Sequence, residues 1–172
     1  MYKTVGEVLG EAVLKWGDLE AVIVRHQQIR WSFRELADAV DRFASGLLEL
    51  GLQPGDRVGI WSPNNIEWIV TQFAAAKAGL ILVNVNPAYR LSELEYALNK
   101  VGCKALILAQ RFKSSDYVAM IRELAPELDH SSPSQLKSKK LPQLESVIHL
   151  GAEPIPGFHR FQDVGGLAGE AS

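Results

Sequence analysis

The chain has 172 residues, enough for one domain with a sizeable core, and its content of 47% hydrophobic and 22% charged residues is typical of a globular protein. The formal net charge of −2 gives no electrostatic reason to expect a nucleic acid or an anionic membrane as partner. The single cysteine, Cys103, excludes an intramolecular disulfide, and the apolar runs are too short for a transmembrane segment.

The spacing of apolar residues predicts strands that alternate with helices. Thr4 with Glu7, and Ser32 with Glu35, have the spacing of a capping box at the start of a helix. The expected elements are a helix to about Trp16, a hairpin of strands 21–25 and 29–33, a helix over 33–50, strand 57–61, a helix over 66–77, strand 80–85, a helix from about 92 to 101, strand 104–109, a helix over 115–125 and strand 146–150. Crossovers of this length join parallel strands, so we expect an α/β fold with an open, mostly parallel sheet and helices on both faces, preceded by a small hairpin and helix.

Helix ends are marked by particular side chains. Asn64 is expected to cap the helix of residues 66–77, and Gly79 to supply the left-handed residue that ends it. Ser92 with Glu95 is expected to form a further capping box.

The end of the chain differs in composition from the rest. Residues 126–142 predict a loop, and residues 151–172 hold two prolines and five glycines without a period. We therefore expect residues 1–150 to form a domain and residues 151–172 to be a disordered tail.

Ligands of open parallel sheets bind at the carboxyl ends of the strands, which directs attention to the loops 61–65, 84–89 and 109–115. Arg111 and Lys113 follow a strand and precede a helix, so they predict a phosphate-binding position. A solvated cationic loop is the alternative.

The other polar residues of these loops also have two interpretations. Those of the first loop and its helix predict either a pocket rim or a helix entry with capping side chains and a core tryptophan: Trp61, Ser62, Asn64, Asn65 and Trp68. Asn84 and Asn86 are explained equally well by turn chemistry. The histidines have no metal-ligand spacing and no nucleophile neighbour in the sequence, so we expect no catalytic residue and no metal ligand.

Several segments share a resemblance. They are WSPNNIEW (61–68), AKAG (76–79), VNVNPAY (83–89), GDRV (55–58), WSFREL (31–36), ELEYALNKVGCK (93–104) and RFK (111–113). Together and in this order they resemble the amino-terminal part of the AMP-forming acyl-CoA ligases of the adenylate-forming superfamily, and are most similar to the mitochondrial medium-chain branch. The resemblance is strong over about 4–128 and weaker to about 164.

The resemblance implies a fatty acid–CoA ligase that forms an acyl-adenylate and then an acyl-CoA, with ATP, Mg²⁺ and CoA. It also implies that Arg111 and Lys113 contact the CoA phosphate. The family's phosphate loop ending in Pro-Lys-Gly, its adenine-binding segment, its ribose-binding Asp and its C-terminal Lys have no counterpart in this sequence. We therefore expect an incomplete copy of the large N-terminal domain that is inactive alone and binds no cofactor tightly.

Location and partners follow from the same resemblance. The branch is mitochondrial, but no transit peptide is visible in this sequence, so the cytoplasm is the alternative. The expected partners are fatty acid and CoA for the parent enzyme and, for this chain, the remainder of the adenylation domain, with self-association as a further expectation. A non-catalytic truncated isoform that acts as an interaction module is the alternative function.

Overall fold

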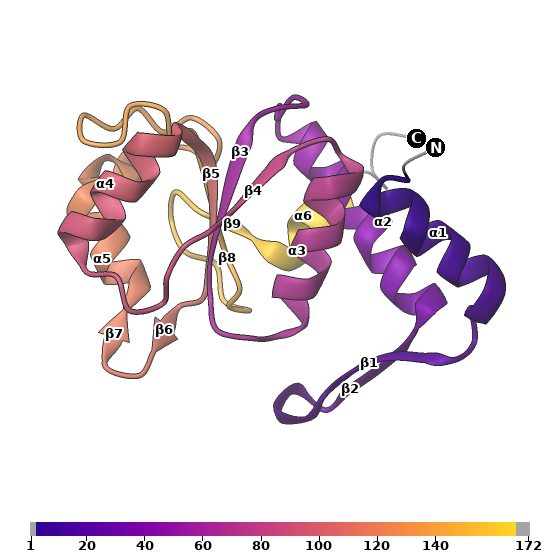
Figure 1. Cartoon of the computed structure of the whole chain (residues 1–172). Coiled ribbons are helices and arrows are strands. Elements are labelled where there is room, and N and C mark those ends of the chain that lie inside the picture. The colour runs from indigo at the N-terminus through magenta and orange to yellow at the C-terminus, as the bar shows by residue number, and fades with distance from the viewer. Residues whose placement is uncertain (1–2, 168–172) are drawn as a thin grey trace.

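A computed structural model describes residues 3–167, in which helices cover both faces of one central sheet (Figure 1). The helices are α1 (Val5–Trp16), α2 (Phe33–Glu49), α3 (Ile66–Lys77), α4 (Leu91–Val101), α5 (Tyr117–Leu124) and α6 (Phe161–Leu167), with 3₁₀ turns η1 (Arg25–Gln27) and η2 (Pro126–His130). The strands are β1 (Glu20–Val24), β2 (Ile29–Ser32), β3 (Arg57–Trp61), β4 (Ile81–Asn84), β5 (Cys103–Leu108), β6 (Arg111–Phe112), β7 (Ser115–Asp116), β8 (Ser146–His149) and β9 (His159–Arg160).

The central sheet has the strand order β4-β3-β5-β8-β9, and each neighbouring pair is parallel. Two antiparallel hairpins, β1–β2 and β6–β7, lie outside it. The predicted α/β fold, with its mostly parallel sheet, its helices on both faces and its preceding hairpin, is confirmed. Across residues 3–167 no helix is long and apolar enough to span a membrane.

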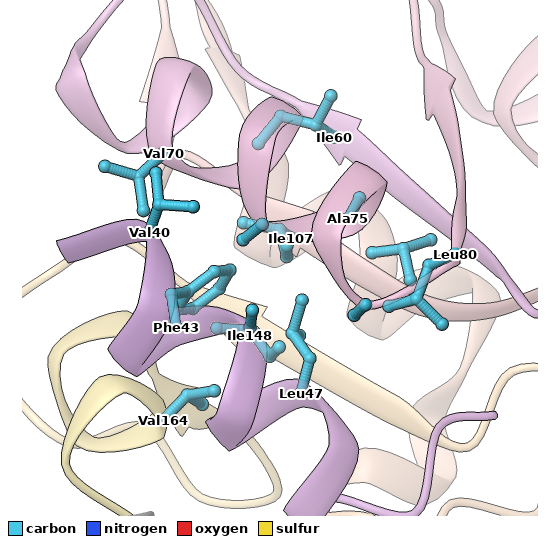
Figure 2. Close-up of a cluster of buried hydrophobic side chains, with 14 of the residues drawn as sticks. Val40, Phe43, Leu47, Ile60, Val70, Ala75, Leu80, Ile107, Ile148 and Val164 are labelled. Carbon is cyan, nitrogen blue, oxygen red and sulfur yellow. The ribbon is translucent and has the colours of Figure 1, made fainter. Parts of the chain in front are cut away.

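The two faces of the sheet bury different side chains because successive residues of a strand point to opposite sides. On one face Ile60, Ile107 and Ile148 contact apolar side chains of α2, α3 and α6, and Figure 2 shows these elements meeting around them. On the other face Leu106 and Leu108 belong to a second cluster with α4 and α5. Strand alternation therefore places α2, α3 and the short α6 in one layer and α4 and α5 in the other.

The end of α3 is built as the sequence predicts. Gly79 has φ +72°, and the amide of Leu80 donates to the carbonyl of Ala75 at 2.8 Å, which is the longer hydrogen bond of a Schellman motif. The start of α3 differs by one residue, since Asn65 rather than Asn64 caps it by accepting from the amide of Trp68 at 2.8 Å. Adjacent asparagines are equivalent by composition, and only the backbone conformation distinguishes them.

The start of α4 corrects a second predicted cap. The helix begins at Leu91, so Ser92 lies inside its first turn and its hydroxyl donates to the carboxylate of Glu93 at 3.3 Å. Glu93, not Glu95, accepts from the backbone amide of Arg90 at 3.1 Å. The Ser92–Glu95 box is therefore wrong, because an arginine occupies the capping position that the sequence rules reserve for small polar residues.

The predicted disordered tail is wrong for the residues from Phe158 to Leu167. Phe158 and Val164 are buried, and the ring of Phe161 stacks on Phe43 of α2 with centroids 4.0 Å apart. These apolar residues recur every three positions, but the segment is too short for a period to stand out among its glycines. The predicted tail residues 168–172 lie outside the described part of the chain.

Exchanging single glycines for alanine should separate the helix end from an ordinary helical position. Gly79→Ala should lower the free energy of unfolding by about 1–2 kcal/mol, because a side chain disfavours positive φ and its Cβ would lie 3.2 Å from Cβ of Pro54. Gly10→Ala, inside α1 and with no atom within 4 Å of the added Cβ, should raise it by about 0.5–1 kcal/mol. Urea unfolding measures both, and shifts of the same sign would contradict the assigned end of α3.

Candidate functional site

The carboxyl ends of the parallel strands lie at one edge of the sheet, where open α/β folds bind their ligands. β3 ends at Trp61, β4 at Asn84 and β5 at Leu108. The three loops singled out in the sequence leave from these ends, and the β6–β7 hairpin extends from the same edge (Figure 1). The structure therefore brings the predicted loops to one place.

Two stacked aromatic rings join these loops. Trp61, at the end of β3, and Tyr117, at the start of α5, have ring centroids 3.6 Å apart with an interplanar angle of 14°. Each ring also donates to the loop after β4, from Trp61 Nε1 to the carbonyl of Asn86 at 3.1 Å and from Tyr117 Oη to the carbonyl of Pro87 at 2.7 Å. The pair thus fixes the β4–α4 loop against the strand ends. Trp61 is fully buried, so its role is structural and it does not form a pocket rim.

Burial also fixes the protonation of Tyr117. Removal from water disfavours the phenolate and raises the pKa of Tyr117 to about 12. The hydroxyl therefore keeps its proton near pH 7 and remains a donor to Pro87.

The loop between β3 and α3 is a helix entry, as one of the two sequence interpretations had it. Asn65 caps α3 and its Nδ2 donates to Ser62 Oγ at 2.8 Å. Its neighbours still border a hollow: Asn64, Asn65 and Trp68 line about 410 Å³ together with residues 23–26 of the hairpin. Trp68 is partly buried against the core. The loop is therefore a capped helix entry that also borders a hollow.

One residue that contacts the start of α3 from the β1–β2 hairpin has no recognisable sequence pattern. Gln27, which reads as part of a polar connection, accepts from the amide of Ile66 at 2.7 Å through Oε1 and donates to Glu67 at 2.8 Å through Nε2. Its side chain satisfies one of the amides at the start of α3. A contact across about forty residues of sequence leaves no local pattern.

The asparagines of the β4 end follow turn chemistry. Asn86 Oδ1 accepts from the backbone amide of Ala88 at 2.9 Å, and Tyr89 donates to the carbonyl of Asn86 at 3.0 Å. Asn84, at the end of β4, is exposed. The turn interpretation is therefore confirmed for Asn86.

Arg111 and Lys113 lie on the β6–β7 hairpin at the end of β5. The side chain of Arg111 is 75% exposed, and its guanidinium pairs with Asp116 at 3.0 Å. Lys113 has φ +53° in the turn, and its Nζ lies 5.3 Å from the ring centroid of Phe112. Arg90 is a third cation at this hairpin, where it donates to Ser115 Oγ at 3.0 Å. Its position before α4 in the sequence gave no indication of this contact.

The helix N-terminus beside this hairpin already has an anion. Asp116 caps α5 by accepting from the amide of Ala119 at 3.0 Å. That hydrogen bond, with a further contribution from Arg111, holds the pKa of Asp116 below its usual value. A phosphate at this position would compete with a carboxylate for both the helix amide and the guanidinium.

Two further titratable residues, His149 and Cys103, are buried. His149, at the end of β8, is fully buried; its Nδ1 accepts from the amide of Gly151 at 3.1 Å, while burial lowers its pKa. Cys103 is buried as a small apolar residue, and burial raises its pKa to about 12. Among residues 3–167 no three His, Cys, Asp or Glu side chains are grouped to hold a metal. The β6–β7 hairpin at this edge carries the exposed cations Arg111 and Lys113.

Comparison with known sequences identifies a family. The family model described as AMP-binding enzyme matches residues 9–157. The mitochondrial medium-chain acyl-CoA ligase ACSF2 of Rattus norvegicus is 48% identical over 155 residues, which cover 90% of this chain and 25% of the relative. The putative acyl-CoA synthetase YngI of Bacillus subtilis is 33% identical over 168 residues, which cover 98% of this chain and 31% of the relative.

Solved structures share the fold. The anthranilate CoA ligase AuaEII in complex with anthranoyl-AMP superposes with a TM-score of 0.79 at 22% identity, over 95% of this chain and 28% of the other. The N-terminal domain of FACL13 from Mycobacterium tuberculosis superposes with a TM-score of 0.72 at 22% identity, over 86% of this chain and 34% of the other. The chain thus spans a quarter to a third of the length of the proteins that it matches.

Removing one hydroxyl should test the aromatic pair. Tyr117→Phe leaves the stacked ring but removes the donor to Pro87, and it should lower the free energy of unfolding by about 1–2 kcal/mol. Tyr96→Phe is the matched control: Tyr96 is 67% exposed, and its change should stay within about 0.5 kcal/mol. Urea unfolding measures both variants. Equal midpoints for Tyr117→Phe and the wild type would show that the hydrogen bond does not stabilise the loop.

Proposed function

The chain belongs to the family of AMP-binding enzymes, and from this we propose that it is the N-terminal portion of an ATP-dependent fatty acid–CoA ligase. The observation that carries the proposal is the near-complete match of the chain to a medium-chain acyl-CoA ligase, at an identity well above chance. The name of that relative also supports a mitochondrial location. In this proposal residues 1–150 are the N-terminal part of the adenylation domain, and α6 packs onto them.

The proposed reaction has two steps. The fatty acid carboxylate attacks the α-phosphorus of ATP and pyrophosphate leaves; the CoA thiolate then attacks the acyl-adenylate and AMP leaves. Mg²⁺ neutralises phosphate charge in such reactions. Since residues 3–167 contain no group of side chains suited to a metal, we assign none of them to it.

This chain contributes positions for binding in the proposal, and no reactive groups. Its sheet fixes the strand-end edge, and the Trp61–Tyr117 pair fixes the loop after β4 at that edge. A pocket between subdomains has only one wall here, and half a cleft encloses a ligand too poorly to offset the entropy of holding it. The isolated chain should therefore form no acyl-adenylate and bind neither ATP nor CoA tightly.

A chimera tests this proposal. The segment of the rat relative that aligns with this chain is replaced by the chain, and the product should make octanoyl-CoA and exchange pyrophosphate into ATP in the presence of octanoate. The chain alone should show no octanoate-dependent exchange. The control is the chimera with Ile107→Asp, which places a charge at a fully buried position of β5 and should abolish folding and activity.

Three results would contradict the proposal. They are a chimera that folds, as circular dichroism reports, but makes no octanoyl-CoA; acid-dependent exchange by the chain alone; and micromolar binding of ATP to the chain in calorimetry. A chain that is inactive in the chimera yet binds the intact ligase would favour the interaction module instead.

We further propose that Arg111 and Lys113 bind the CoA phosphate. Their position on a hairpin at the strand-end edge supports this, as does the exposure of Arg111, which leaves its guanidinium accessible. On binding, the ion pair between Arg111 and Asp116 would be replaced by one between Arg111 and the phosphate, while Asp116 would still accept from the amide of Ala119.

In the chimera, the double change Arg111→Ala with Lys113→Ala should raise KM for CoA by about tenfold or more, since hydrogen bonds to charged groups contribute roughly 1.5–3 kcal/mol. Octanoate-dependent pyrophosphate exchange should stay unchanged, because that step does not involve CoA. The control is Lys100→Ala with Lys140→Ala, two exposed lysines away from the hairpin. A KM that moves equally in both double variants would return Arg111 and Lys113 to the solvated-loop interpretation.

A further inference from the structure

A serine, a second serine and a histidine form a hydrogen-bonded series away from the strand-end edge. Ser146, the first residue of β8, donates its hydroxyl to Ser134 Oγ at 3.0 Å. Ser134 Oγ lies 2.7 Å from Nε2 of His159, the first residue of β9. In the tautomer of His159 that carries its hydrogen on Nδ1, Nε2 is an acceptor and Ser134 Oγ donates to it. A serine hydroxyl aimed at an imidazole nitrogen at this distance is the arrangement of a nucleophile with its general base.

The backbone at Ser134 has a conformation that rarely carries a side chain. The carbonyl of Ser132 accepts from the amide of Gln135 at 3.1 Å, which closes a turn with Pro133 at its second position and Ser134 at its third. Ser134 has φ +62°, and turns with Pro second and positive φ third favour glycine there. Strained residues of this kind cluster at reactive sites, where the strain fixes the side chain in place.

Access and protonation also suit a reaction. Ser134 lines a surface hollow of about 950 Å³, large enough for a small molecule, with Lys137 and Lys139 among the other lining residues. Ser146 is 3% exposed and supports Ser134 from inside. Burial lowers the pKa of His159 and outweighs the opposite effect of Asp163, so the ring is neutral near pH 7 and Nε2 is able to accept a proton.

We propose that Ser134 is a nucleophilic serine, with His159 as its general base, and that it accepts acyl groups from activated carboxylic esters entering this hollow. Ser134 Oγ forms the bond to the carbonyl carbon, and its proton moves to His159 Nε2. The bond from that carbon to the leaving oxygen breaks, and the leaving group departs as an alkoxide or phenolate. The product is an O-acyl serine. This reaction is independent of adenylate formation, since Ser134 lies beside Ser146 at the amino end of β8 and uses none of the residues at the opposite edge.

The test uses the full chain and two probes, a fluorophosphonate and p-nitrophenyl acetate. With the fluorophosphonate, the Ser134 Oγ–phosphorus bond forms, fluoride leaves and the proton again moves to His159. Peptide mass mapping should place the label on Ser134. His159→Gln should slow labelling by about 100-fold or more, the usual contribution of a general base. Ser132→Ala is the matched control, because Ser132 lines the same hollow but the hydrogen bond to His159 comes from Ser134, so the loss of the Ser132 hydroxyl should leave the rate unchanged.

Ser134→Gly separates chemistry from folding. Glycine suits φ +62°, which offsets the loss of the hydrogen bonds to Ser146 and His159, so this variant should still fold while its labelling and acetylation are lost. The proposal is overturned if the label lies on another residue, if Ser134→Gly reacts as fast as the wild type, if folded His159→Gln keeps the full rate, or if the native chain reacts no faster than the chain unfolded in urea.

Discussion

A parallel sheet whose strands are joined by helices is covered on both faces, so each central strand must bury side chains on both sides. In β5 the four residues from Ala105 to Leu108 are inaccessible to solvent, and alternate residues belong to the two different core clusters. This constraint decides which helices lie on which side, and it leaves only the strand ends and loops for polar chemistry. The position of the candidate site at the edge of the sheet is a consequence of how completely its faces are filled.

The strand-end edge is ordered by contacts that involve few polar side chains. Trp61 comes from the end of β3 and Tyr117 from the start of α5, and both donate to backbone carbonyls of the loop after β4. Backbone acceptors of this kind do not depend on the side chains of the loop, so the loop sequence can vary in composition while the rings hold its path. Arg111 of the β6–β7 hairpin, by contrast, is exposed and held by an ion pair to Asp116, and an exposed pair of this kind contributes little to folding.

The sequence predicts most of the fold because its signals are local. Gly79 ends α3, and Thr4 with Glu7 begins α1, through contacts within one turn. Where the sequence rules fail, the deciding contact is distant or unusual, as for Arg90 at a helix cap or Gln27, which caps a helix thirty-nine residues later. The candidate site divides in the same way. The strand-end loops follow from topology, whereas the pairing of Arg111 with Asp116 and the approach of Ser134 to His159 need coordinates.

The packing of α6 on α2 has a practical meaning for defining this domain. Gly46 of α2 lies directly against the backbone of Val164, so that even a methyl group would not fit between the two helices. An expression boundary drawn at residue 150, where glycine and proline become frequent, would cut through this interface and expose the ring of Phe43 together with the core behind it. Glycine here permits close approach of two helices, and a boundary chosen by composition alone would mistake a packed contact for a linker.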